Sequence, residues 1–118
     1  MYLDWYKCSG DVWCELNRVD LNHKYIQNTA GVYVIWEGKD NSVIKVGHGK
    51  IGDELQNEVK DKAILAFSNL ILFVSWAEVS MINRKGVYTY LSNALHPKIS
   101  ESDLKGSGIE VNFPWEEE

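Results

Sequence analysis

The stretch from Gly31 to Gly49, GVYVIWEGKDNSVIKVGHG, constrains the fold of this chain more than any other part of the sequence. Its two apolar runs, VYVIW and SVIKV, are rich in β-branched and aromatic residues, which favour strands. The tetrapeptide GKDN between them consists of residues that form turns. The pattern therefore predicts a β-hairpin.

The residues after the hairpin alternate between helical and strand patterns. Between 51 and 67, apolar residues recur at helical spacing, which predicts one amphipathic helix. The run LILFV at 70–74 predicts a third strand, in the centre of a sheet covered on both sides. Residues 78–95 return to a helical period that Pro97 ends, with Gly86 as a candidate point of division into two helices.

Two further strand patterns lie near the ends of the chain. Apolar and polar residues alternate from 12 to 16, and again in IEVNF at 109–113, just before Pro114. We expect these two segments to pair with each other. Trp5, Trp13 and Trp115 lie in the same terminal parts, where aromatic side chains seal either a core or a partner surface.

Length and charge exclude several classes of protein. A chain of 118 residues suits one domain, and the net charge of −5 disfavours nucleic acid as a partner. The longest uncharged run, 63–77, is shorter than the ~20 residues of a membrane helix. The first residues lack the basic start and apolar stretch of a secretion signal, so we expect a cytoplasmic protein in which Cys8 and Cys14 are reduced.

The motifs Gly31-Val32-Tyr33 and Lys45-Val46-Gly47, separated by eleven residues, resemble the two signature elements of the GIY-YIG nuclease domain. The order of hairpin, helix, strand and helices resembles that domain as well. The resemblance covers residues 31–100. It implies an α/β fold with a small central antiparallel sheet of about three strands flanked by helices, with extra terminal strands. The whole chain, 1–118, would then be a single domain with segments 1–30 and 101–118 packed on this core.

The resemblance also implies a site. In the family, a tyrosine of the first strand activates water, a second tyrosine and an arginine position the phosphate, and a glutamate holds one divalent metal. Carried over position by position, the resemblance keeps the first tyrosine as Tyr33 and replaces the other groups. The second tyrosine is replaced by Lys45, the arginine by Glu54, a histidine that follows it by Glu58, the metal-binding glutamate by Tyr88 and a late asparagine by Ser100.

These replacements predict a domain with a degenerate active site that binds rather than cuts. A protein is the first candidate partner, nucleic acid the second, and no cofactor is expected. The alternative is a divergent endonuclease that cleaves DNA with Tyr33 as base. In that case Lys45 and Arg84 would hold the phosphate, and Glu54, Glu58 or Glu78 would hold Mg²⁺. A third hypothesis is an inhibitor whose acidic surface mimics nucleic acid.

The candidate residues of the residual cleft are Tyr33, Lys45, His48 and Arg84. A lysine beside a phenol would lower the pKa of that phenol, and a histidine can transfer protons near neutral pH. The alternative for the same residues is structural: a packed strand tyrosine, an edge-strand charge and a turn histidine.

The remaining polar residues are predicted to be structural. Glu54 and Glu58 are expected to form a solvated helix face, with Lys62 offsetting Glu58. Tyr88 is expected to fill the cleft that the missing carboxylate would have opened, with its hydroxyl near Ser100. The three histidines have no metal-ligand spacing, so no metal site is predicted.

Overall fold

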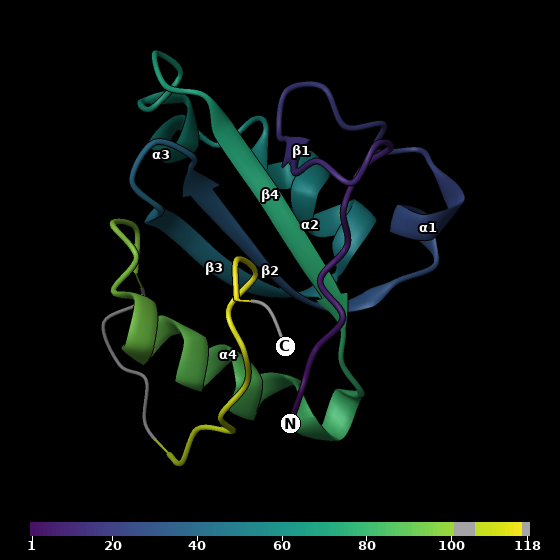
Figure 1. Ribbon diagram of the computed structural model, residues 1–118, viewed down its shortest axis with the longest axis vertical. Helices are drawn as coiled ribbons and strands as arrows, with labels where there is room; N and C mark the ends of the chain where they lie inside the picture. Colours follow the sequence, from purple (N-terminus) through teal and green to yellow (C-terminus); the bar gives the residue numbers. More distant parts are fainter. Residues whose placement is uncertain (101–105, 117–118) are drawn as a thin grey trace.

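The computed structural model describes residues 1–100 and 106–116. This part of the chain forms strands and helices in the order β1 (Cys14–Glu15), α1 (Lys24–Gln27), β2 (Ala30–Glu37), β3 (Ser42–Lys50), α2 (Ile51–Glu58), α3 (Lys62–Leu65), β4 (Leu72–Glu78) and α4 (Met81–Leu95). Figure 1 shows that the strands form a central layer with helices around it. The predicted α/β class with a small antiparallel sheet is confirmed.

The four strands of the described residues form one antiparallel sheet in the order β1-β4-β2-β3. The predicted hairpin is confirmed: β2 pairs with β3, and Tyr33 lies opposite Gly47. β4 pairs along the other side of β2, from Gly31 opposite Glu78 to Glu37 opposite Leu72. The predicted strand at 70–74 therefore starts two residues later and continues to residue 78, because β2 offers it hydrogen-bond partners along that whole length. The short strand β1 adds a fourth member to the expected three.

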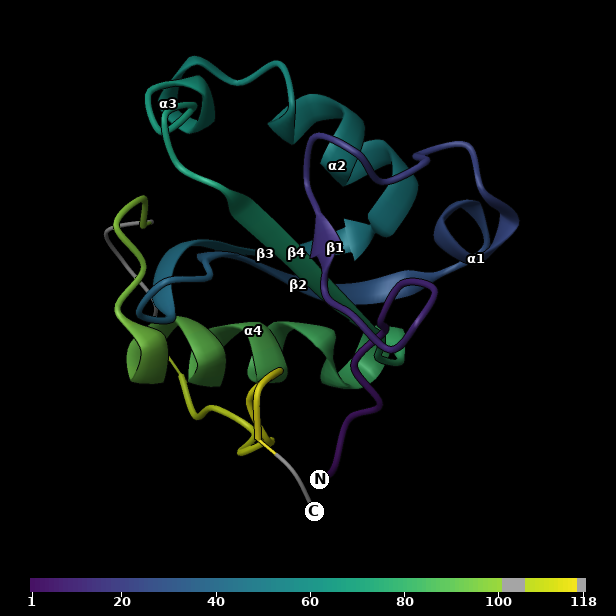
Figure 2. The same cartoon turned by 45° about the horizontal axis from the view of Figure 1, so that its top comes forward.

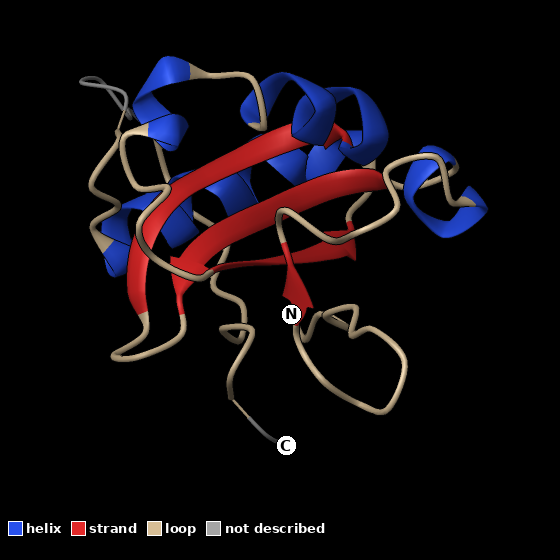
Figure 3. Cartoon of the chain, turned by 90° about the horizontal axis from the view of Figure 1, so that it is seen from above, coloured by secondary structure: helices blue, strands red, loops and turns tan. Residues whose placement is uncertain are grey.

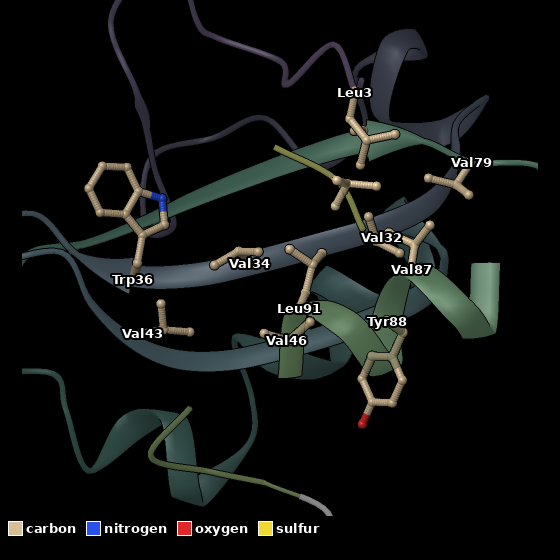
Figure 4. Packing of buried hydrophobic residues seen from close by; sticks show 12 residues of the cluster. Leu3, Val32, Val34, Trp36, Val43, Val46, Val79, Val87, Tyr88 and Leu91 are labelled. Atoms are coloured by element: carbon tan, nitrogen blue, oxygen red, sulfur yellow. The ribbon is translucent and has the colours of Figure 1, made fainter. Parts of the chain in front are cut away.

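The two faces of the sheet are covered by different helices. Successive side chains of a strand point to opposite faces, so Val32, Val34 and Trp36 pack in one cluster while Tyr33 and Ile35 pack in the other. α4 covers the first face, and α2 and α3 cover the second, as Figure 2 shows. Figure 3 shows the strands of the sheet from above. Figure 4 shows the cluster beneath α4. β3 lies at one edge of the sheet. It contacts α4 on one face and α2 on the other.

The helices differ from prediction in two places. The single helix expected at 51–67 is divided into α2 and α3, and the Asp61 side chain begins α3 by accepting a hydrogen bond from the Ala63 amide. α4 is one continuous helix, so Gly86 does not divide it. Instead, the Gly86 carbonyl accepts the Ile109 amide at 2.9 Å. None of the helices in residues 1–100 and 106–116 combines the length and apolar character that a membrane crossing requires.

The strand predicted at 109–113 does not form. The segment runs beside the N-terminal residues, and the Asn112 side chain, instead of a backbone ladder, forms hydrogen bonds to them. Its Oδ1 accepts the Leu3 amide at 2.6 Å, and its Nδ2 donates to the Leu3 carbonyl at 3.0 Å. Val111 is buried against the α4 cluster, and Trp115 packs on Trp36. The tryptophans of the terminal segments thus cover core residues, while 101–105 and 117–118 lie outside the described residues.

Cys8 and Cys14 form a disulfide, so the expectation of reduced cysteines is wrong. A tight turn brings them together: Gly10 and Asp11 both have positive φ, and the Cys8 amide donates to the Val12 carbonyl at 2.8 Å. Sequence spacing alone could not show this reversal of the chain. Disulfides persist in oxidising compartments. This bond is therefore an argument against the cytoplasmic location, which stays a prediction.

Candidate functional site

A cleft of about 240 Å³ opens at the edge of the sheet formed by β3. Its lining combines residues from β2, from both faces of β3, from the first turn of α2, from α4 and from the segment after α4. These residues are Tyr33, Lys45, Val46, Gly47, His48, Glu54, Tyr88, Ile99 and Ser100. Three of the four predicted site residues, Tyr33, Lys45 and His48, therefore meet in one place.

The glycine of the second motif allows Tyr33 to reach this edge. A Cβ atom at Gly47 would lie 2.2 Å from Cζ and from the hydroxyl oxygen of Tyr33. Real Cβ atoms do not approach other atoms so closely, so only glycine lets the Tyr33 ring lie directly across the backbone of β3. The ring is buried, and its hydroxyl points past the edge strand toward the end of α2.

Glu58, the last residue of α2, joins the strands to the helix from beneath the cleft. Its Oε2 accepts the Tyr33 hydroxyl at 2.6 Å, and its Oε1 accepts the Lys45 ammonium at 2.9 Å. The Glu58 side chain is only 4% exposed, against 28% for Lys45. The predicted solvated face with Lys62 is therefore wrong for Glu58, which is the buried centre of a polar triad with Tyr33 and Lys45.

The triad sets the proton affinity of Tyr33. Burial raises the pKa of the Tyr33 phenol well above its usual range, and the hydrogen bond and negative charge of Glu58 raise it further, followed by the charge of Glu54. The expectation that Lys45 would lower this pKa is wrong, because Lys45 directs its charge to Glu58. A neutral Tyr33 can donate a hydrogen bond at neutral pH but is a poor base.

This raised pKa predicts a loss of stability in alkali. The unfolded tyrosine ionises near its ordinary value of 10.0 while the folded one stays protonated, so stability that is complete below pH 10 falls as the pH rises. We expect Tyr33 alone to account for about 1 kcal/mol between pH 10 and pH 11. Urea unfolding of the wild type and of Tyr33→Phe at pH 9, 10 and 11 measures it. A difference between the two proteins that stays constant with pH would contradict the assignment.

Arg84, the fourth predicted site residue, is not part of the cleft lining. Its Nε and Nη2 atoms donate to the Val79 carbonyl at 3.3 and 3.2 Å, just before α4 begins. Glu78, an alternative metal ligand, lies opposite Gly31 at the end of β4, whereas the cleft opens beside Gly47 on the other strand of the hairpin. The structure therefore does not bring Arg84 or Glu78 together with the triad.

Tyr88 is the residue to which the resemblance assigned the place of a metal ligand. It is buried against the α4 cluster, and its ring lies 4.7 Å from the His48 ring between centroids. Its hydroxyl points away from the aliphatic side chains of that cluster (Figure 4), and Ser100 lines the same cleft. Within residues 1–100 and 106–116, no three His, Cys, Asp or Glu side chains gather closely enough to hold a metal ion.

The chain matches no protein-family model, and comparisons with curated proteins and with solved structures found no match either. Membership of the GIY-YIG family thus stays a prediction that depends on the residues of the chain alone.

The buried position of Glu58 is the feature of the site that sequence reasoning missed, because the favoured prediction placed it on a solvated helix face. The signal was present: Ile51, Leu55 and Glu58 occupy positions i, i+4 and i+7, so they share one helix face. Ile51 and Leu55 are fully buried, and a carboxylate on the same stripe needs an internal partner. Four-residue spacing from Glu54 instead suggested an exposed pair. Glu54 is half-buried rather than fully solvated and lines the cleft, so the two glutamates differ in role.

Proposed function

We propose that this chain is a GIY-YIG-like domain that serves as a binding module and does not cleave phosphodiesters. The element order supports it: a hairpin is followed by two short helices, a strand beside the first hairpin strand, and a long helix. Tyr33 of the first motif and Gly47 of the second lie opposite each other in adjacent strands.

One observation carries the loss of activity. The Tyr33 hydroxyl donates a hydrogen bond to the buried Glu58 carboxylate at 2.6 Å, which holds the phenol in its neutral form. A phenol must lose its proton before it can take one from water, and phosphate binding near Tyr33 would also meet the charge of Glu54. Loss of one side chain that stabilises charge in the transition state lowers the rate of cleavage by about 10²–10³.

A protein is the partner that the charge favours. Nucleic acid is bound by neutralising phosphates with Lys and Arg, yet this chain carries twelve basic against seventeen acidic residues. In the cleft, the single lysine is already paired with Glu58. No cationic side chain in the described lining is therefore left to hold a phosphate group.

Cleavage assays test this function. The protein is incubated with linear DNA, branched DNA and RNA, each with millimolar Mg²⁺ or Mn²⁺, beside a Tyr33→Phe variant. We expect equal, background levels of product from both proteins. Metal-dependent cleavage by the wild type that Tyr33→Phe abolishes would overturn the proposal and support the endonuclease.

A further inference from the structure

We propose that the cleft at the edge of β3 receives a basic side chain, arginine or lysine, presented by a partner protein. This inference rests on the proposed function, since it names what the binding module recognises. It concerns the open part of the cleft, above the triad, where Glu54, His48 and Tyr88 form the walls.

The charges of the site favour a cation. Lys45 and Glu58 neutralise each other at 2.9 Å, and both oxygens of Glu58 are occupied by Lys45 and Tyr33. This leaves Glu54 as the charged group of the lining that makes no hydrogen bond or ion pair with another described residue. An arriving carboxylate or phosphate would meet uncompensated negative charge, whereas a guanidinium or ammonium group would be attracted.

The aromatic wall favours the same ligand. His48 and Tyr88 approach each other from β3 and α4, with ring centroids 4.7 Å apart, and both line the cleft. Aromatic rings attract cations through their electron-rich faces, and guanidinium groups also stack on them. A carboxylate beside an aromatic wall therefore offers two complementary contacts to one basic side chain.

The size of the cleft limits the ligand to one side chain. Sites for complete small molecules usually enclose about 300–1,000 Å³. This cleft has about 240 Å³, and it opens at a sheet edge rather than inside a core. The end of an arginine or lysine side chain fits that volume, while the rest of the partner would remain on the surface. A nucleotide base with its sugar and phosphate would exceed it.

NMR titration with blocked amino acids tests the inference. Nα-acetyl-arginine N-methylamide and the lysine analogue are added to ¹⁵N-labelled protein, and the uncharged isostere Nα-acetyl-citrulline N-methylamide serves as control. We expect amide shifts confined to Gly47, His48, Gly49 and Glu54 that saturate on the order of millimolar probe. The citrulline probe should bind about three- to fivefold more weakly or not at all. Comparing the arginine and lysine probes shows which side chain is preferred.

Two variants of α2 locate the interaction. Glu54→Gln should weaken binding of the arginine probe about three- to fivefold, because it removes the uncompensated charge. Asp53→Asn removes one charge from the same helical turn, but Asp53 does not line the cleft, so binding should stay unchanged. Equal losses in both variants would show only general electrostatic attraction and would overturn the site.

The outcomes also separate this inference from the proposed function. Shifts at the same amides with inorganic phosphate, and none with the arginine or lysine probe, would overturn the cationic ligand while leaving a non-cleaving module intact. Metal-dependent DNA cleavage would overturn the function whichever probe binds.

Discussion

Replacing Glu58 with alanine is expected to lower the free energy of unfolding by about 2–4 kcal/mol. The substitution leaves the Lys45 ammonium and the buried Tyr33 hydroxyl without the oxygens that now accept their hydrogen bonds at 2.9 and 2.6 Å. Losing one partner of a buried polar group is costly because the remaining groups stay desolvated and unpaired. Urea unfolding at pH 7 measures the change.

Two controls show whether the loss belongs to the triad. Glu54→Ala removes a carboxylate one helical turn earlier that makes no ion pair with a described residue, so its effect should stay within about 0.5 kcal/mol. The triple variant Tyr33→Phe, Lys45→Met, Glu58→Leu removes all the polar groups together. It should be more stable than Glu58→Ala, because an apolar set of similar volume leaves nothing unpaired. A triple variant less stable than the single one would contradict this account.

The triad fixes the relation between three elements that are distant in sequence. Tyr33 lies on β2, Lys45 on β3 and Glu58 at the end of α2, and 25 residues separate the tyrosine from the glutamate. Hydrogen bonds among them hold the end of α2 against the edge of the sheet. Glu54, one turn earlier on that helix, is thereby placed over the cleft. Glu58 thus contributes to stability, and Glu54 on the same helix contributes to recognition.

The sequence predicted the parts of the fold that local patterns determine. The hairpin follows from two β-rich runs and a turn, and the strand after α3 from a continuous apolar run. The convergence of Tyr33, Lys45 and His48 was a hypothesis based on the two glycine motifs, and all three residues line one cleft. The position of Gly47 explains why that motif carries a glycine, because the Tyr33 ring occupies the space of its missing side chain.

Features that depend on long-range packing could not be predicted. The alternation at 109–113 correctly marks Val111 as buried, but Asn112 binds the Leu3 backbone with its side chain instead of entering a ladder. Helical spacing places Glu58 on the stripe of the buried residues Ile51 and Leu55, yet it does not show that Tyr33 is its partner. Both failures have one cause: alternation and spacing report burial, not which partner satisfies a polar group.

Gly31→Ala is expected to destabilise the protein by about 3 kcal/mol. A Cβ atom at Gly31 would lie 2.0 Å from the Ala77 carbonyl oxygen and 2.7 Å from the Val79 amide nitrogen. Both are backbone atoms of the chain that pairs with β2, so the clash cannot be relieved by rotating a side chain. β2 and β4 must separate locally, which weakens the pairing that holds β4 in the sheet and the core on both faces. Thermal and urea unfolding measure the loss.

Gly52→Ala is the matched control for this prediction. A Cβ atom there would come within 2.7 Å of Gln27 Nε2, which is the far end of a flexible side chain. Gly52 also lies in α2, where alanine is favoured over glycine by up to about 1 kcal/mol. We therefore expect a stability within about 0.5 kcal/mol of the wild type. If Gly31→Ala proved as harmless as Gly52→Ala, the close approach of β2 and β4 at Gly31, and with it this explanation of the first glycine motif, would be wrong.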